Sequence, residues 1–134
     1  MTNEEIAKHI MSELIEKGDL SLIEKHFSAD YVAHAGGKKY KGHKFLTRFT
    51  KQLRKAIPDI HAVDLQILTA EPDRIAWQRT LAGVHKVKMQ GIPASKKKLT
   101  WVEMAVTRFE DGKIVEEWVV SDLMGQMLLN IPSK

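Results

Sequence analysis

The sequence predicts an α+β fold, in which helices come first and a curved, mixed, mostly antiparallel sheet follows. Up to residue 57, apolar side chains recur at helical spacing, whereas from residue 60 to residue 121 they alternate with a period of two. The candidate strands are about eleven residues long, roughly twice the usual length, and long strands twist and curl. We therefore expect the sheet to wrap into a cone, with the N-terminal helices covering a central pocket.

Three helices are predicted before the sheet. Thr2 and Glu5 form a capping box at the start of the first, and Pro58 ends the third, because proline disfavours helical geometry in the residue before it. The third helix has an apolar stripe on one side and basic residues on the other. The segment 29–37 is expected to be irregular. The predicted helices cover residues 2–17, 19–27 and 42–57.

Four strands are predicted after the helices. Asp111-Gly112 favours a tight hairpin turn between the last two strands. Residues 86–98 are expected to form a loop or hairpin, and residues 123–131 a short helical tail. The predicted strands cover residues 60–70, 74–85, 99–109 and 114–121.

The chain has 134 residues and is expected to form a single domain over residues 1–134. It contains no cysteine, which excludes disulfides, cysteine-ligated zinc and thiol catalysis. The first twenty residues carry acidic side chains and lack the apolar core of a signal peptide. No stretch approaches the about 18 continuous apolar residues of a membrane-spanning helix. We expect a cytoplasmic protein with no membrane partner.

Asp122 is the first candidate for chemistry. It follows the last predicted strand, and alternation places it on the same face as Trp118 and Val120. If that face lines the pocket, apolar surroundings would raise the pKa of the Asp122 carboxyl and suit it to be a general acid or base. The alternative is that Asp122 is the N-cap of a helix beginning at Leu123. The two roles are compatible.

Two histidines are further candidates, and a purely structural role is the alternative for each. His85 shares strand parity with Trp77 and Arg79 and would face the same pocket, whereas His34 lies in the irregular segment. Two histidines and a carboxylate can bind a metal ion. No pair of them has close ligand spacing, so we expect no metal.

The pocket walls are expected to be largely aromatic, although plain core is the alternative for each tryptophan. Arg79 and Glu103 can pair across neighbouring strands. The expected lining residues are Tyr31, Phe45, Phe49, Trp77, Arg79, Trp101, Glu103 and Trp118.

The net charge of +4 is unevenly distributed. Residues 36–58 contain eight basic and no acidic side chains, and residues 84–100 contain five basic and no acidic ones. A solvated surface is the simplest interpretation, and an anion or a phosphate backbone is the alternative ligand for the basic blocks 38–55 and 86–98. Neither block interleaves its cations with a row of aromatics, so we expect no nucleic-acid partner.

Several short segments occur in an order that resembles the SnoaL-like polyketide cyclase family, part of the nuclear-transport-factor-2-like superfamily. The resemblance extends over roughly residues 4–130. The segments that carry it are Tyr31-Val32-Ala33-His34, Gly42-His43-Lys44-Phe45, Ile57-Pro58-Asp59, Gly83-Val84-His85, Gly91-Ile92-Pro93-Ala94-Ser95-Lys96, and residues 111–118 followed by Asp122.

The resemblance implies a helix-capped, curved sheet around a pocket and a homodimer formed through the sheet. It also implies catalysis without cofactor or metal, with Asp122 as the acid/base and His34 and His85 as pocket histidines. The chain departs from the family pattern at Gly36, where the cyclases carry a second acidic residue, and at Val87, where they carry glycine.

We therefore expect an enzyme that performs aldol cyclisation, isomerisation or a related reaction on an apolar, carbonyl-bearing small molecule. The alternative is a ligand-binding or dimerisation module of the same fold without catalysis, because fold does not decide function.

Overall fold

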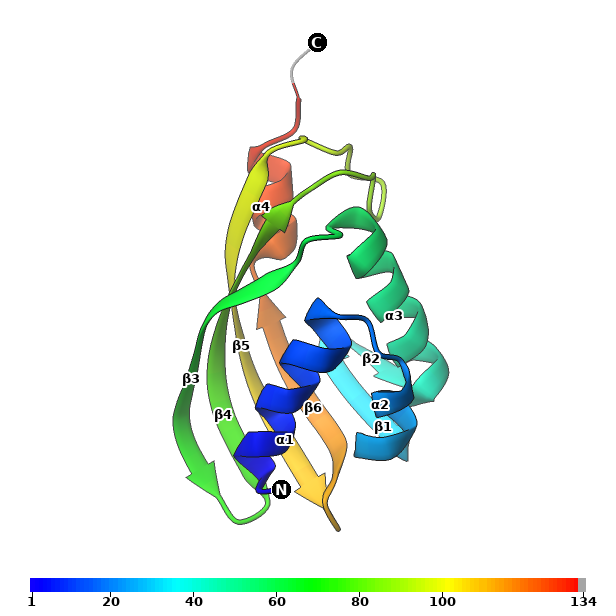
Figure 1. Ribbon diagram of the computed structural model, residues 1–134, viewed down its shortest axis with the longest axis vertical. Helices are drawn as coiled ribbons and strands as arrows, with labels where there is room; N and C mark the ends of the chain where they lie inside the picture. Colours follow the sequence, from blue (N-terminus) through cyan, green and yellow to red (C-terminus); the bar gives the residue numbers. More distant parts are fainter. Residues whose placement is uncertain (133–134) are drawn as a thin grey trace.

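A computed structural model describes residues 1–132 and contains one six-stranded sheet with helices packed against it (Figure 1). The strand order is β2-β1-β6-β5-β4-β3, and neighbours are antiparallel except for β1 and β6, which run parallel. The elements are α1 (Asn3–His9), η1 (Ile10–Glu16), α2 (Ser21–His26), β1 (Phe27–Ala35), β2 (Lys38–Lys41), α3 (Gly42–Ala56), β3 (His61–Glu71), β4 (Arg74–Val84), β5 (Lys98–Glu110), β6 (Lys113–Ser121) and α4 (Leu123–Leu129).

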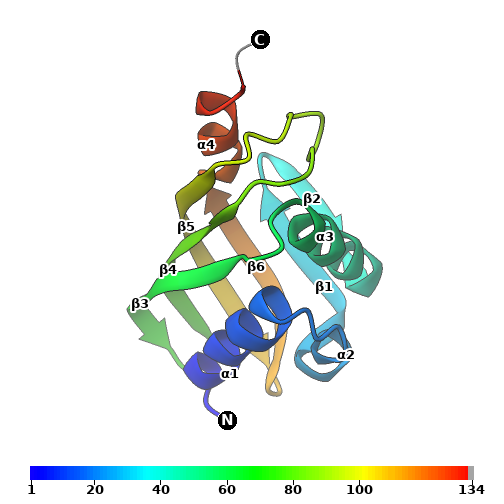
Figure 2. The same cartoon turned by 45° about the horizontal axis from the view of Figure 1, so that its top comes forward.

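The sheet curves around the helices, as the sequence predicted. Figures 1 and 2 show α1 and α3 on the concave side of the sheet and α4 beyond the end of β6. Register shifts interrupt the β3–β4 pairing twice and the β5–β6 pairing once, between Arg108 and Phe109. Such bulges bend strands and increase their twist. The predicted α+β fold class with a curved, mostly antiparallel sheet is confirmed.

The N-terminal helix begins as its capping residues predict. Thr2 Oγ1 accepts a hydrogen bond from the Glu5 amide at 3.1 Å, and Glu5 Oε1 accepts one from the Thr2 amide at 3.0 Å. The helix continues as the π-helical turns of η1, which end at Glu16, and the turn that follows contains Gly18, whose φ is +78°. The Arg54 side chain occupies the space that a Gly18 side chain would need, so the turn and α3 fit closely together.

The expectation that residues 29–37 are irregular is wrong. Residues 29–35 belong to β1, which forms a hairpin with β2 through the turn residues Gly36 and Gly37. Both glycines have positive φ, at 59° and 76°. The strand is fixed by its parallel pairing with β6, more than eighty residues away in the sequence. Local periodicity gives no signal for a pairing of that kind.

Burial distinguishes the two faces of the sheet. The inner face packs against the helices, and its core includes Ile75, Trp77, Leu81, Trp101 and Phe109. The outer face leaves large apolar side chains exposed, namely Leu68, Val102, Met104, Trp118 and Val120. Full burial of a leucine- or phenylalanine-sized side chain contributes about 1.5–3 kcal/mol, so the inner face holds the fold together.

No helix within residues 1–132 combines the length and the apolar character that crossing a membrane requires.

Candidate active site

A row of three polar side chains crosses the inner face. Arg79 on β4, Glu103 on β5 and Ser121 on β6 are neighbours in strand register. Arg79 Nη2 lies 2.6 Å from Glu103 Oε1, and Ser121 Oγ donates to Glu103 Oε2 at 2.9 Å. The Trp101 indole N–H also donates to Glu103 Oε2, at 3.2 Å. The predicted pairing of Arg79 with Glu103 is confirmed, with three donors around one carboxylate.

A second buried network is centred on Glu117. Tyr31 Oη donates to Glu117 Oε1 at 2.8 Å, and Thr107 Oγ1 donates to Glu117 Oε2 at 2.6 Å. The Trp77 indole N–H donates to Thr107 Oγ1 at 3.0 Å, so the network reaches β4. Burial, together with the Glu117 carboxylate, raises the pKa of Tyr31 well above its usual value. The Tyr31 hydroxyl therefore stays protonated and remains a donor.

The Arg79 guanidinium belongs to the first network and also contacts Trp77 of the second. Its Cζ is 4.8 Å from the centroid of the Trp77 ring, which places a cation over an aromatic face. Arg79 is 8% exposed, and its Nε has no hydrogen-bond partner within residues 1–132. Arg79 thus brings a positive charge, with donor capacity left over, to the inner face of the cone.

Asp122 stands at the start of α4, next to Ser121 of the inner row. The desolvated surroundings expected for Asp122 are not observed, because its side chain is exposed. Its carboxylate also makes no N-cap bond; the Leu123 amide donates to Ser121 Oγ instead, at 3.2 Å. Asp122 Oδ2 accepts from Gln126 Nε2 at 2.9 Å. A Cβ at Gly125 would collide with Asp122 Oδ1, so this glycine leaves room for the carboxylate.

His85 is completely buried, directly after β4. Its amide donates to the Lys97 carbonyl at 3.1 Å, and its carbonyl accepts from the Lys96 amide at 3.0 Å. Neither ring nitrogen makes a well-formed hydrogen bond within the described residues. Burial lowers the pKa of His85, which keeps the imidazole neutral near neutral pH.

His34 and Trp118 lie on the outer face, away from the other predicted lining residues. Their rings stack with centroids 5.1 Å apart and planes within 5°, and His34 Nε2 lies 2.7 Å from Glu116 Oε2. The expectation that Trp118 faces the same side as Trp77 and Trp101 is wrong. Trp118 is paired with Val106, which faces outward, so Trp118 faces outward as well. A difference of one residue in strand register exchanges the two faces of a strand.

The aromatic side chains of α3 lie at its flank. Phe45 stacks between Tyr40 and Phe49, with ring centroids 4.7 and 5.8 Å away. Phe45 is partly buried against the core, whereas Phe49 is 36% exposed. Of the two predicted lining residues on this helix, only Phe45 therefore reaches the core.

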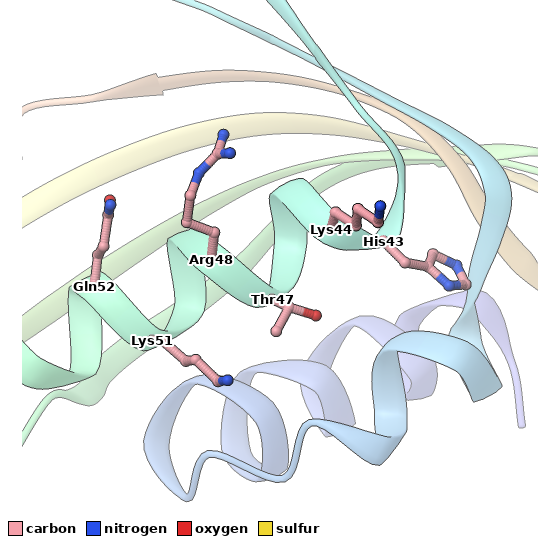
Figure 3. Close-up of a pocket in the computed structure, with 6 residues that line it drawn as sticks. All are labelled: His43, Lys44, Thr47, Arg48, Lys51 and Gln52. Atoms are coloured by element: carbon pink, nitrogen blue, oxygen red, sulfur yellow. The ribbon is translucent and has the colours of Figure 1, made fainter.

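Two hollows in the described part of the chain open on the outside. One, of about 370 Å³, lies at the β1–β2 turn and is lined by His34, Trp118 and the hairpin. The other, of about 480 Å³, runs along α3 (Figure 3). The central pocket stays a prediction that depends on a ligand entering between the helices and the inner face.

Sequence reasoning missed three members of the inner networks, Thr107, Glu117 and Ser121. Thr107 has the same strand parity as Trp101 and Glu103, so parity could have identified it. Glu117 and Ser121 could not be assigned, because their orientation depends on the β5–β6 register and its bulge.

Comparison with known proteins gives a family and a fold. The sequence model of the SnoaL-like polyketide cyclase family matches residues 5–128, nearly the whole chain. A search of curated proteins found no match.

Similar solved structures cover almost all of the chain. A candidate SnoaL-like polyketide cyclase from Jannaschia sp. CCS1 has a TM-score of 0.86 and 18% identity, covering 98% of this chain and 92% of its own. IdmH, a candidate polyketide cyclase from Streptomyces antibioticus, has a TM-score of 0.79 and 21% identity, covering 95% and 96%. AclR, a candidate hydroxylase from Streptomyces galilaeus, has a TM-score of 0.79 and 26% identity, covering 96% and 79%.

Proposed function

Because the chain belongs to the SnoaL-like polyketide cyclase family, we propose that it is an enzyme that performs cofactor-free acid/base chemistry on an apolar, carbonyl-bearing small molecule. The observation that supports this most strongly is the position of Asp122. Its carboxylate follows directly on Ser121, which ends the polar row that begins at Arg79. The strand register thereby places a proton acceptor directly after a row of polar side chains that contains a fixed cation.

In the proposed reaction, the Asp122 carboxylate takes a proton from a carbon flanked by carbonyl groups. The resulting enolate carbon attacks a second carbonyl of the same molecule, which forms a carbon–carbon bond and an alkoxide. The Asp122 carboxyl then returns the proton to that alkoxide, so the ring closes without a net change in protons or electrons.

The inner face supplies the binding groups. We assign the stabilisation of the enolate oxygen to Arg79, because its buried Nε has no hydrogen-bond partner within residues 1–132 and its guanidinium is held by Glu103. Trp77 and Trp101 offer apolar walls for a flat ligand. Neutral His85 is assigned to orienting or polarising a carbonyl. His34 lies on the outer face, so Arg79 takes the place expected for it.

The alternative is a ligand-binding module without catalysis. The exposure of Asp122 favours it, since a solvated carboxylate is a weak base toward a carbon acid. A ligand that covers Asp122 would exclude water from the carboxylate and make it a stronger base. A measurement of turnover therefore distinguishes the two functions, whereas the exposure of Asp122 in the ligand-free protein does not.

The test uses an aromatic ketone that carries a methylene group between two carbonyls and a further carbonyl placed to close a six-membered ring. Product is followed by absorbance and chromatography. We expect Asp122→Asn to lower turnover by about 10²–10⁴-fold, the usual contribution of a general acid/base. Asp73→Asn, on an exposed turn, is the matched control and should retain full turnover.

Gly125→Ala sharpens the test, because it keeps the carboxylate but displaces it. It should lower kcat while leaving affinity for the ketone, measured by tryptophan fluorescence, largely unchanged. Product formation that survives Asp122→Asn would refute the mechanism. Binding without any product from the wild-type protein would establish the module instead.

A further inference from the structure

The two basic blocks of the sequence meet in the folded molecule. The amides of Lys86 and Val87 both donate to the carbonyl of Ala56, at 2.7 and 3.3 Å, which joins the second block to the C-terminal end of α3. Figures 1 and 2 show the 85–97 loop beside that end of the helix. Lys86 and Lys88, which are both exposed, therefore lie near the C-terminal end of α3.

Four cations of α3 form a ridge on its exposed side, which we call the α3 ridge: Lys44, Arg48, Lys51 and Lys55. Their spacing of four, three and four residues places them within a narrow arc over about 16 Å of helix. Within residues 1–132, none of the four pairs with a carboxylate or forms a side-chain hydrogen bond. Figure 3 shows Lys44, Arg48 and Lys51 on successive turns.

The α3 ridge does not stabilise the fold. Lys44 with Arg48, and Lys51 with Lys55, are like-charge pairs at the i,i+4 spacing, which destabilises a helix. The first turn of α3 contains no acidic residue, so nothing offsets the unfavourable placement of cations near the positive end of the helix dipole. Arg54, by contrast, donates to the carbonyl oxygens of Ile15 and Glu16 and ties α3 to η1.

The surroundings of the α3 ridge suit a phosphate chain. The hollow of about 480 Å³ along the helix is lined by side chains that are cationic or can donate hydrogen bonds, and it includes no carboxylate: His43, Lys44, Thr47, Arg48, Lys51 and Gln52. The stack of Tyr40, Phe45 and Phe49 flanks the ridge, and Phe49 is exposed enough to contact a base. In the folded chain, the three aromatic side chains of the 38–55 block are thus stacked together beside its cations.

A membrane surface fits α3 less well. An interfacial helix buries its apolar face in the bilayer, but the apolar face of α3 is already packed in the core through Leu46, Leu53 and Ala56. The side that remains is polar and basic, which is enough for a phosphate backbone.

We propose that the α3 ridge binds the phosphate backbone of nucleic acid without reading its base sequence. Binding of this kind depends on counterion release, so affinity falls steeply with salt. The inference is independent of the acid/base chemistry, because the ridge lies on the far side of α3 from the core.

The test is fluorescence anisotropy of a labelled 20-base-pair DNA duplex of mixed sequence, titrated with the full chain at several salt concentrations. The triple variant Lys44→Gln, Arg48→Gln, Lys51→Gln should weaken binding by at least tenfold at low salt. It should also make the salt slope shallower by about 0.9 for each phosphate that is no longer neutralised, or about 2.7 in all. The matched control is Lys8→Gln, Lys25→Gln, Lys113→Gln, which removes the same charge from other elements and should keep affinity within about twofold.

Each other outcome contradicts the proposal. An equal loss in the control variant would mean that net charge, and not the α3 ridge, drives binding. Absence of binding at low salt would exclude nucleic acid. Binding of the wild-type chain to phosphatidylglycerol vesicles, without binding to DNA, would assign the ridge to a membrane. Circular dichroism of both variants checks that they are folded.

Discussion

The inner and outer faces of the sheet carry the same kind of ion pair in different surroundings. Arg79 and Glu103 pair directly across β4 and β5, and Arg108 and Glu116 pair directly across β5 and β6. The side chains of the inner pair are 10% and 14% exposed, and those of the outer pair 25% and 23%. On the inner face, Trp101 and Ser121 also donate hydrogen bonds to Glu103. On the outer face, His34 makes a further hydrogen bond with Glu116.

The difference shows that surroundings, rather than the pair itself, decide what a charge contributes. A buried pair that loses one member leaves a charge without a partner, whereas water compensates the same loss at the surface. The inner face is therefore where polar groups constrain the fold and remain available to a ligand. The outer face can change with little consequence for folding.

The largest expected effect is the loss of the inner cation. Arg79→Met should lower the free energy of unfolding by about 3–5 kcal/mol, because Glu103 stays buried without its partner. Urea unfolding measures this. Arg108→Met is the control on the outer face and should cost clearly less. The double variant Arg79→Met, Glu103→Leu should recover most of the loss; an unrecovered double variant would contradict the explanation.

A smaller effect is expected at the second inner carboxylate. Tyr31→Phe removes one of the two hydroxyl donors to Glu117 and should cost about 1–3 kcal/mol, the penalty for an unsatisfied buried acceptor. Tyr40→Phe is matched chemically but removes no observed hydrogen bond within the described residues, and should stay within about 0.5 kcal/mol. Equal unfolding midpoints in urea for the two variants would count against the network.

A pH effect is expected from His85. Its pKa is lowered by burial, so the unfolded chain takes up a proton near its ordinary value of about 6.5 while the folded chain does not. Stability should be fully present above that pH and decline as the pH falls toward the lowered folded pKa.

The check is the thermal unfolding midpoint between pH 7.5 and 5.5, where His85→Phe should flatten the decline. His26 also has a pKa lowered by burial, so His26→Gln is the necessary comparison. If only His26→Gln flattened the curve, the assignment to His85 would be wrong.

The smallest effect on folding is expected at the outer face, where the predicted homodimer would form. Met104→Glu with Val120→Glu places charges on exposed positions and should leave the unfolding midpoint nearly unchanged. If the sheet is the dimer interface, the same variant should be monomeric by light scattering while the wild type is dimeric. A dimer that survives both charges would place the interface elsewhere.

The order of the helices and of the last four strands can be predicted from the sequence because it depends on local signals. The Thr2–Glu5 capping box, the proline after α3 and the Asp111-Gly112 turn all act within a few residues. β1 cannot be predicted in this way, because its parallel partner β6 lies far away along the chain and no local sequence pattern indicates the pairing.

The residues of the candidate site likewise fall into those that local sequence signals predict and those that depend on long-range pairing. The sequence predicts the Arg79–Glu103 pair, because the alternation of side chains places both residues on the same face of two neighbouring strands. The orientations of Trp118 and Glu117 depend on the register between β5 and β6, which includes a bulge that spacing does not reveal. The exposure of Asp122 depends on how α4 leaves the sheet, which is a property of packing.

The three tryptophans allow the central claim, that a ligand binds at the inner face, to be tested directly. Trp77 and Trp101 lie on that face and Trp118 on the other. We would record the three indole N–H signals by ¹⁵N NMR while titrating the aromatic ketone proposed as substrate. We expect shifts for Trp77 and Trp101 with little change at Trp118. A shift confined to Trp118 would place the ligand in the outer hollow beside His34 and contradict binding at the inner face.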